Sequence, residues 1–306
     1  MIYTLTVNPS LDYFMEIENL ELGKVNRSCK EKLLPGGKGI NVSLMLNNLG
    51  IKNKAFGFLA GFTGKQIEKT LKKEKVKTDF IYVDGLSRIN VKAKSKKEET
   101  ELNANGLDVN QKKQISLLKK VSYLKNNDIL VVSGNVPTSL GIEFYNKILK
   151  QCNKKNVKIV LDVNGKCLKD LLRFKPFVIK PNIYELEELF DVKVRSREEV
   201  ISYGKKLNEM GISNVLISLG GQGAVLVSEN NKVYDSFDLF TNGVPECKQI
   251  INTVASGDSM LAGFLTGLEK GNGIEYAFKL AICAGSASAS VEWLATEEEI
   301  MDMMLK

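Results

Sequence analysis

Asn252-Thr253-Val254-Ala255-Ser256-Gly257-Asp258 runs directly into the strongly helical segment 259–265. Backbone N–H groups at the start of a helix have no partner, and the aligned peptide dipoles favour negative charge there. The small residues Ala255, Ser256 and Gly257 allow an anion to approach these amides without a clash. The stretch therefore predicts an anion-binding turn, in which Asp258 either accepts a proton beside the anion or simply caps the helix.

Apolar runs of strand length alternate with amphipathic helical segments over most of the chain. The expected strands lie at residues 2–7, 56–59, 129–133, 158–162, 177–180, 215–219 and 224–227. The expected helices lie at residues 40–49, 65–75, 110–124, 140–153, 183–189, 197–210, 258–269 and 274–291. This alternation is typical of a layered α/β fold with a mostly parallel central sheet.

Two places interrupt the alternation. Residues 12–18 and 24–30, and then 88–95 and 99–103, alternate apolar and polar side chains with no helix between them. We expect a small separate sheet, made by segments inserted at about 12–30 and 87–104, that covers a site or meets a second subunit. The chain has no low-complexity linker and no internal repeat, so residues 1–306 are expected to form a single domain with this sheet as its lid.

The composition excludes several classes of active site. None of the 306 residues is histidine, which rules out Ser-His-Asp and Cys-His hydrolysis, histidine-ligated zinc and histidine acid–base chemistry. A general base must therefore be Asp, Glu, Lys, Cys or Tyr. The five cysteines are scattered and never form C-x-x-C, so neither a disulfide framework nor a zinc site is expected.

Charge and hydropathy are those of an ordinary soluble globular protein. With 43% hydrophobic and 26% charged residues, the chain can bury a full core. No apolar stretch reaches the ~18 residues of a membrane span, and the start lacks the basic region of a signal peptide, so we expect a cytoplasmic protein with no membrane partner. The formal charge of +7 is compatible with phosphorylated metabolites. The scattered lysines have no interleaved aromatic residues, so no nucleic-acid partner is expected.

Pro35-Gly36-Gly37-Lys38-Gly39-Ile40-Asn41 is a second glycine-rich turn before a helix. Three glycines in four residues indicate close approach of the backbone to a ligand, whereas a structural turn needs only one or two. Asn41 follows one helical turn later, and Lys38 adds positive charge where a phosphate could bind. These features favour a ligand-binding turn over a purely structural one.

Two nucleotide-binding fingerprints are absent. The glycines of Ser218-Leu219-Gly220-Gly221-Gln222-Gly223 follow a strand, but they do not match G-x-G-x-x-G, and the next segment reads as another strand. A hairpin turn and a nucleotide contact both remain open there. Gly61-Phe62-Thr63-Gly64-Lys65-Gln66 lacks the spacing of a Walker A loop and the Ser or Thr that would hold magnesium. Any nucleotide chemistry must therefore use another architecture.

Four further polar residues are candidates for ligand binding. Asn182 and Glu185 are oxygen donors suited to hydrated magnesium or its phosphates, although an N-cap with a capping box explains both. Asp12 could accept hydrogen bonds from sugar hydroxyls, and the forked guanidinium of Arg88 could clamp a phosphate. Each of these two also fits a simple surface charge.

Together these motifs resemble the ribokinase-like carbohydrate kinases of the pfkB family, essentially from end to end. Residues 35–43 correspond to the first of two family signature regions and 252–265 to the second, and the ordered pair is highly specific. Residues 180–185 resemble the family's Asn-x-x-Glu element. The resemblance implies a three-layer α/β/α fold with a mostly parallel central sheet and a small β-sheet lid, and relatives suggest a homodimer through the lid.

The resemblance also implies roles for individual residues. Asp258 would be the catalytic base, and the amides of Ala255, Ser256, Gly257 and Asp258 would stabilise charge on the γ-phosphoryl of ATP. Sugar hydroxyls would bind Asp12, Gly37, Gly39 and Asn41, and the substrate's phosphate would bind Lys38 and Arg88. ATP, with indirectly held Mg²⁺, would lie against Lys180, Asn182, Glu185, Ser218, Gly220, Gly221 and Gly223, with Cys283 and Ser286 near adenine.

The substrate is also suggested by the resemblance. Residues 8–13, 61–64, 88–92 and 99–103 are most similar to family members that phosphorylate fructose 1-phosphate at its 6-hydroxyl, and members acting on tagatose 6-phosphate share much of the pattern. A non-catalytic sugar-phosphate binder is the alternative from another class, and the intact Asp258 argues against it. One departure is that many members begin the anion turn with Gly-Ala-Gly-Asp, where this chain has Ala255 and Ser256.

Overall fold

Ten strands form the central sheet in the computed structural model, which describes residues 1–95, 98–137, 139–245 and 249–305. Their order is β14-β13-β12-β11-β10-β9-β1-β4-β5, with β6 also paired to β4. Their bounds are β1 Ile2–Thr6, β4 Asn53–Ala60, β5 Lys77–Thr78, β6 Ile81–Val83, β9 Ile129–Ser133, β10 Lys158–Asp162, β11 Val178–Ile179, β12 Asn214–Ser218, β13 Ala224–Ser228 and β14 Lys232–Asp235. Only β12–β13 and β13–β14 pair antiparallel among these described strands, so the mostly parallel sheet expected from the alternation is confirmed.

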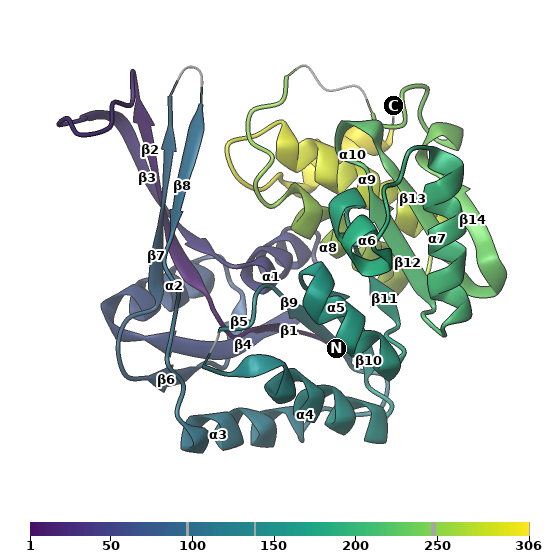
Figure 1. Cartoon of the computed structure of the whole chain (residues 1–306), viewed down its shortest axis with the longest axis horizontal. Helices are drawn as coiled ribbons and strands as arrows, with labels where there is room; N and C mark the ends of the chain where they lie inside the picture. Colours follow the sequence, from purple (N-terminus) through teal and green to yellow (C-terminus); the bar gives the residue numbers. More distant parts are fainter. Residues whose placement is uncertain (96–97, 138, 246–248, 306) are drawn as a thin grey trace.

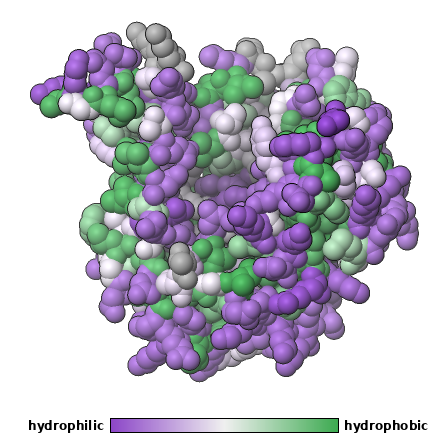
Figure 2. Space-filling model, in the orientation of Figure 1, coloured by the Kyte–Doolittle hydropathy of each residue, from purple (hydrophilic) through white to green (hydrophobic). Residues whose placement is uncertain are grey.

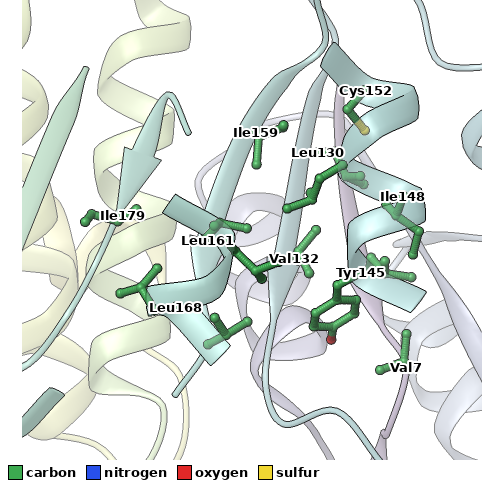
Figure 3. Packing of buried hydrophobic residues seen from close by; sticks show 14 of the residues in the cluster. Val7, Leu130, Val132, Tyr145, Ile148, Cys152, Ile159, Leu161, Leu168 and Ile179 are labelled. Atoms are coloured by element: carbon green, nitrogen blue, oxygen red, sulfur yellow. The ribbon is translucent and has the colours of Figure 1, made fainter. Parts of the chain in front are cut away.

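Helices cover both faces of this sheet, and each face has its own buried layer (Figure 1). One face carries α1 Lys38–Asn48, α2 Gly61–Lys73, α8 Ser256–Lys270, α9 Ile274–Ala289 and α10 Glu297–Met304. The other carries α3 Gln111–Val121, α4 Gly141–Lys154, α5 Gly165–Leu171, α6 Ile183–Phe190 and α7 Arg197–Glu209. Figure 3 shows part of the second layer, where Tyr145 and Ile148 of α4 lie with Leu130 and Val132 of β9. The central strands are apolar on both sides because helices cover both sides.

A second, four-stranded sheet, called the lid below, stands apart from the central one (Figure 1). It has the order β3-β2-β7-β8, with β2 Ser10–Ile17, β3 Ser28–Gly36, β7 Arg88–Lys94 and β8 Glu99–Asn103. The strand expected at residues 24–30 lies later than the sequence indicated, because the alternating pattern continues to the glycine turn. As a result β3 leads directly into that turn and into α1.

The elements that the sequence missed are short or lie at the sheet's edges. They are β5, β6, β14, α5 and α10, none of which exceeds eight residues. Such segments have too few periodic apolar positions to stand out from loops. The helix expected from residue 65 begins at Gly61, so Gly61-Phe62-Thr63-Gly64 forms its first turn. No helix in the described ranges is long and apolar enough to cross a bilayer.

The parallel strands bring several polar residues to one edge of the central sheet. Ser133, Asp162 and Ser218 end β9, β10 and β12, and Lys180 follows β11. Because β9 to β12 run parallel, their carboxyl ends meet at the same edge, where open α/β sheets bind ligands. The expected ligand-binding turns at the starts of α1 and α8 reach this same edge.

Candidate active site

A cavity of about 490 Å³ lies between the carboxyl edge of the central sheet and the lid. The hollow between the lid and the rest of the chain is visible on the surface in Figure 2. Twelve of the residues singled out from the sequence line it: Asp12, Gly37, Lys38, Asn41, Arg88, Lys180, Asn182, Glu185, Ser218, Ala255, Gly257 and Asp258. The fold therefore gathers both glycine turns and the lid around a single cavity.

Asp258 lines this cavity and does not cap its helix. The N-cap of α8 is Ala255, which has no side-chain cap bond, and Asp258 is the third residue of the helix. Its carboxylate is only 6% exposed and accepts a hydrogen bond from Nδ2 of Asn41 at 2.8 Å. The capping explanation for Asp258 is therefore wrong, and the carboxylate is held at the cavity by the other glycine turn's helix.

That carboxylate belongs to a cluster of four charged residues, Lys38, Asp162, Lys180 and Asp258, called the buried cluster below because all but Lys38, whose side chain is 37% exposed, are closed off from solvent. Burial raises the pKa of Asp258 to about 7, and the carboxylate of Asp162 adds to the rise, while Lys38, Asn41 and Lys180 oppose it. Asp162 accepts ion pairs from Nζ of Lys38 at 3.0 Å and from Nζ of Lys180 at 3.5 Å. Burial would raise the pKa of Asp162, but these two ammonium groups hold it below its ordinary value. The cluster therefore holds one carboxylate, Asp162, ionised, while the other, Asp258, titrates near neutral pH.

Lys38 lies at the Asp258 end of the cavity. Burial would lower its pKa, but the carboxylates of Asp162, Asp258 and Glu185 together raise it. The amino group is thus committed to the buried cluster. Lys38 and Arg88 line the same cavity, so the expectation that both bind the substrate's own phosphate stays a prediction.

The anion turn at the start of α8 is built closely around Lys180. A Cβ on Gly257 would lie 3.1 Å from Nζ of Lys180, a tight contact, so a glycine here lets the ammonium group approach the turn closely. The amide of Ser256 is bonded to the carbonyl of Thr253, and the Ser256 hydroxyl donates to that carbonyl as well. Helical geometry provides no partner for the amides of Gly257 and Asp258, so these two amides are suited to an anion.

The glycines of the first turn are explained partly by packing within the chain. A Cβ on Gly36 would lie 2.4 Å from Oδ2 of Asp12, and one on Gly39 would lie 2.5 Å from Oγ1 of Thr6. Gly39 is buried and does not line the cavity, so the prediction that it contacts substrate is not supported. Gly37 lines the cavity and has a φ of 115° that favours glycine.

The cavity is lined by buried polar atoms that lack partners, on the lid and at the edge of the central sheet. Asp12 accepts hydrogen bonds from Oγ of Ser10 at 2.6 Å and Nδ2 of Asn90 at 2.9 Å, which fixes its carboxylate. In the described part of the chain, Asn8 Oδ1, Asn90 Oδ1, Ser133 Oγ and Arg88 Nε are buried without a hydrogen-bond partner, and all four residues line the cavity. Since buried polar atoms are normally satisfied, these atoms indicate a polar ligand.

Asn182 and Glu185 form a capping box at the start of α6. The Asn182 side chain accepts from the Glu185 amide at 2.9 Å, and Oε2 of Glu185 accepts from the Asn182 amide at 2.9 Å. The cap expected as one of two explanations is confirmed. Both residues also line the cavity, so the cap does not remove them from a ligand's reach.

A second groove of about 210 Å³ adjoins the cavity, and the two share Ser218 and Gly257 as lining residues. Gly220, Gly221, Gly223, Ser256 and Ser286 line this groove, together with apolar residues such as Val244, Pro245 and Ile282. The glycines form the turn of the β12–β13 hairpin. The prediction that Cys283 lies near adenine is not supported, because its side chain is fully buried in the core on the inner face of α9 and does not line the groove.

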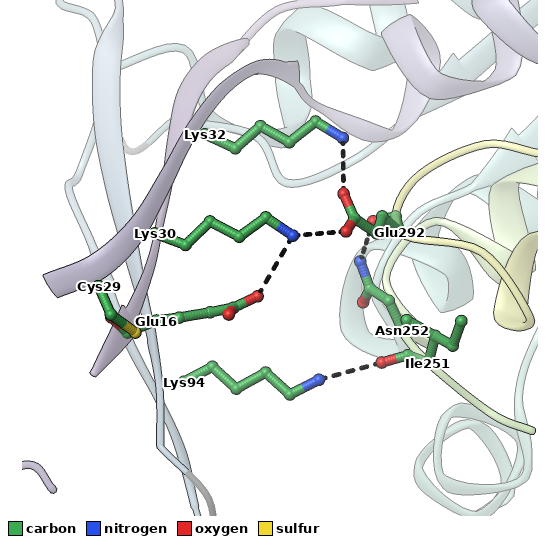
Figure 4. Close-up of polar contacts among 8 residues, drawn as sticks. All are labelled: Glu16, Cys29, Lys30, Lys32, Lys94, Ile251, Asn252 and Glu292. Atoms are coloured by element: carbon green, nitrogen blue, oxygen red, sulfur yellow. Dashed lines mark hydrogen bonds and ion pairs between the residues drawn. The ribbon is translucent and has the colours of Figure 1, made fainter. Parts of the chain in front are cut away.

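A lid clasp of exposed polar contacts joins the lid to the main body beyond the cavity (Figure 4). Glu292 accepts ion pairs from Lys30 at 2.6 Å and Lys32 at 3.3 Å, both on β3. Lys94 of β7 donates to the carbonyl of Ile251 at 3.1 Å. Asn252, the first residue of the anion-turn stretch, donates to the Glu292 carbonyl at 2.9 Å. The lid is thus linked to the segment that leads into Asp258.

A family model described as pfkB family carbohydrate kinase matches residues 6–299. The chain belongs to the pfkB family. The 1-phosphofructokinase of Bacillus subtilis is 42% identical over 304 residues, which cover 99% of this chain and 97% of the relative. The D-tagatose-1-phosphate kinase of Bacillus licheniformis is 36% identical over 290 residues, 94% of this chain and 92% of the relative. Phosphofructokinase-2 of Escherichia coli, solved with substrates and products, has a TM-score of 0.93 at 24% identity, covering 99% and 98%, which shows a shared fold.

Membership confirms the family resemblance read from the two signature regions. The protein is a carbohydrate kinase, a phosphotransferase whose acceptor is an alcohol group and whose co-substrate is ATP. The departure of this chain from Gly-Ala-Gly-Asp has a structural cost, because Ala255 adopts a φ of 65° in the left-handed region. An alanine there costs about 1–2 kcal/mol relative to an unstrained conformation, which a glycine avoids.

Several residues of the pfkB site were missed in the sequence. They are Asn8, Asn90, Lys92, Glu101, Ser133 and Asp162. Asp162 had a usable signal, because it directly follows the apolar run Ile159-Val160-Leu161 at the carboxyl end of an expected parallel strand. No such signal in the sequence marked Lys92, because its burial depends on how the lid meets the sheet. In the structure it is 7% exposed and pairs with Glu101 at 2.7 Å.

Proposed function

We propose that this protein phosphorylates fructose 1-phosphate with ATP to give fructose 1,6-bisphosphate. The observation that carries the proposal is the junction of the two cavities at Gly257 and Ser218, with the buried carboxylate of Asp258 beside it. A polar cavity on one side suits a sugar phosphate, and an apolar groove on the other suits a nucleotide base. The 42% identity to a 1-phosphofructokinase along the whole chain supports the choice of substrate.

Asp258 acts as the general base of this reaction. The 6-hydroxyl oxygen attacks the γ-phosphorus, the bond from that phosphorus to the β,γ-bridging oxygen breaks, and the hydroxyl proton passes to Asp258. Asn41 holds the carboxylate in place through its 2.8 Å hydrogen bond. A base with a pKa of about 7 is well matched to proton transfer at neutral pH.

Charge that develops on the transferred phosphoryl group is stabilised by the anion turn and the two lysines of the buried cluster. The amides of Gly257 and Asp258 point from the helix start, and Lys180 lies against Gly257. Lys38 reaches the same region through its pair with Asp162. Because phosphoryl transfer depends mostly on positioning and electrostatics, fixed positive groups at this point lower the barrier directly.

The sugar phosphate lies along the lid side of the larger cavity. Asp12 and Gly37, which line the cavity together with Asn41, bind its hydroxyls. Arg88 binds the existing phosphate, since its Nε is buried without a partner and its Nη1 contacts only the Ala104 carbonyl at 3.3 Å in the described part of the chain. In this proposal the phosphate of the substrate binds at the lid and its free hydroxyl lies at Asp258.

Magnesium fits this site as an ion held mainly through water and phosphate oxygens. The described residues contain no group of three or more Cys, His, Asp and Glu that could form a complete protein cage. Asn182 and Glu185 line the cavity, and the capping box uses one oxygen of Glu185, so the donors available suit the one or two carboxylate contacts typical of Mg²⁺. When bound, the ion neutralises charge on the nucleotide phosphates.

A homodimer through the lid is part of the proposal. Leu33, Ile89 and Leu102 are exposed on lid strands, and their neighbours in sequence, such as Arg88, Asn90 and Glu101, line the cavity on the opposite face. A row of exposed apolar side chains on the outer face of a sheet suits a second copy of the same sheet. Sedimentation should give a dimer for the wild type and a monomer for Leu102→Glu; a monomeric wild type would remove this part of the proposal.

The deciding experiment is a coupled ADP assay with fructose 1-phosphate, fructose 6-phosphate, tagatose 1-phosphate, tagatose 6-phosphate and the unphosphorylated sugars. We expect the highest kcat/KM with fructose 1-phosphate. A higher kcat/KM with tagatose 6-phosphate would assign the alternative substrate. The absence of turnover with every phosphorylated ketose would favour the non-catalytic binder.

A further inference from the structure

Arg197, the first residue of α7, brings five acceptors around one guanidinium group. Its Nε donates to Oδ2 of Asp235 at 2.5 Å, and its Nη2 donates to Oδ1 of the same carboxylate at 2.6 Å. It also donates to the carbonyls of Gln222 and Ala224 and to Oγ of Ser236, each at 3.1 Å. The side chains of Arg197 and Asp235 are only 21% and 17% exposed, so this bidentate pair differs from a screened surface pair.

The two carbonyls that Arg197 binds flank Gly223, in the turn between β12 and β13. Gly223 has a φ of 84°, and a Cβ there would lie 2.1 Å from Oγ of Ser236 and 2.2 Å from the carbonyl oxygen of Gly243. Ser236 also accepts a hydrogen bond from the Ala224 amide at 3.0 Å. The glycine turn is therefore packed directly on two other segments, and Arg197 and Ser236 fix its position between them.

Phe237 extends this arrangement to the next wall of the smaller groove. Its ring stacks on the guanidinium group, with Cζ of Arg197 4.5 Å from the ring centroid. The backbone of Gly243 packs against the same ring, where a Cβ would lie 2.8 Å from Cε2 of Phe237. Val244 and Pro245, which follow Gly243, line the groove.

We infer that Arg197 is a positioning residue for the nucleotide. It fixes the glycine turn of residues 220–223 and the segment 243–245, so that the groove is preformed for a flat purine base. Arg197 is not among the described residues that line the groove, so it acts on the shape of the site without touching the ligand. The inference rests on the proposed function, in which this groove binds ATP.

The hairpin does not depend on Arg197 for its folding. β12 and β13 pair over Val215–Val227, Leu216–Leu226, Ile217–Val225 and Ser218–Ala224, and the apolar side chains of these pairs are fully buried. The strands are therefore held by core packing and their own hydrogen bonds. Loss of Arg197 should loosen the turn at the end of the hairpin while leaving the strands in place, so its effect should appear in nucleotide affinity.

The test compares Arg197→Lys with the control Arg195→Lys, which makes the same change at the exposed residue before the N-cap of α7. Lysine keeps the charge but cannot bind a carboxylate and two carbonyls in one plane. For Arg197→Lys we expect the KM for ATP and the calorimetric Kd for ADP to rise about tenfold. A change of this size corresponds to the loss of one charge-assisted hydrogen bond. We expect kcat at saturating ATP and the KM for the sugar phosphate to stay within about twofold.

The outcomes separate this inference from the proposed function. An unchanged Kd for ADP in a folded Arg197→Lys variant would overturn the inference, whether or not the enzyme turns over fructose 1-phosphate. A raised Kd for ADP supports it even if the substrate is another sugar. If Arg197→Lys does not fold, Phe237→Leu replaces it. Because Phe237 is 49% exposed, its loss should not unfold the protein. We expect the same rise in the Kd for ADP. An unchanged Kd in that variant also counts against the inference.

Discussion

The buried cluster beneath the cavity and the lid clasp beyond it are built from the same kinds of side chain in different surroundings. In the cluster Asp162 and Lys180 are 0% and 6% exposed and only Lys38 reaches 37%, whereas Lys30, Lys32 and Glu292 of the clasp are 51%, 41% and 54% exposed. The ion-pair distances are similar, at 3.0 and 3.5 Å in the cluster and 2.6 and 3.3 Å in the clasp. The distance between the charges therefore does not distinguish an ion pair of the cluster, which affects the reaction, from an ion pair of the clasp, whose attraction is screened by water.

Burial gives the two regions different consequences. In the buried cluster, loss of hydration and the neighbouring Asp162 move the pKa of Asp258 to about 7, where it decides the protonation state of the base. In the clasp, the hydrogen bonds from Lys30 and Lys32 lower the pKa of Glu292, a group that is already ionised at neutral pH. Only the first shift changes a charge under working conditions. We therefore expect the largest mutational effects in the cluster, smaller ones at the lid and the smallest in the clasp.

The sharpest test of the cluster is Asp258→Asn. The amide has the same shape and cannot accept the hydroxyl proton, so kcat should fall ~10²–10⁴-fold or more, while the Kd for ADP stays within about twofold. Glu269→Gln, at the exposed end of the same helix, is the matched control and should retain wild-type turnover. Near-normal kcat in Asp258→Asn would remove Asp258 from the role of base.

The exposure of Arg88 lies between that of the buried cluster and that of the clasp. The residue is half-buried on the lid, and its Nε has no hydrogen-bond partner. Replacing it with methionine should raise the KM for the sugar phosphate ~10- to 100-fold, because a charge-assisted contact to the phosphate is lost. The KM for ATP should not change. Steady-state kinetics with each substrate varied in turn provides the measurement, and an unchanged KM for the sugar phosphate would show that its phosphate is bound elsewhere.

The pH dependence of the reaction tests the coupling within the cluster. Asp258 must be ionised to act as base, and its pKa is raised to about 7, so kcat/KM should rise with pH through about 7 and level off above it. Asp162 is one of the causes that raise the pKa of Asp258, so Asp162→Asn should shift this acid limb to lower pH. Replots of kcat/KM against pH for both enzymes give the comparison.

A control is needed because the sugar phosphate itself titrates near pH 6. This titration is common to the wild type and the variant, so only the difference between their profiles reports on Asp258. Asp170→Asn makes the same substitution at an exposed position of α5 and should leave the profile unchanged. A shift of the Asp162→Asn limb to higher pH, or no shift, would contradict the coupling.

Part of the site could be predicted from the sequence because it lies in short local motifs. The glycine turns, Asp258, Asn41 and the capping pair Asn182 and Glu185 all lie in short motifs whose residue types state their chemistry. The fold followed from the alternation of apolar strands and helices, since parallel strands bring their carboxyl ends together.

What the sequence could not supply depends on packing between distant segments. Asp162 pairs with Lys38, 124 positions away, and Asn41 reaches Asp258 across 217 positions, so neither the pairing nor the pKa shift is encoded locally. Gly39 and Cys283 were assigned to ligands because they lie in or near family motifs. Both are buried against other parts of the chain, which only the packed structure reveals.

The smallest effect should come from the clasp, through Glu292→Gln. This change keeps the shape of the side chain and removes the charge that Lys30 and Lys32 share, so the lid should close over the sugar phosphate slightly less often. Because exposed ion pairs contribute little, we expect the KM for the sugar phosphate to rise less than about fivefold, with a smaller rise at high salt, where the pairs are already screened. Glu16→Gln is a close control, since Glu16 is equally exposed and lies 3.7 Å from Lys30 but belongs to the lid itself. An effect of Glu292→Gln as large as that of Arg88→Met would mean that the clasp, despite its exposure, sets the position of the lid during the reaction.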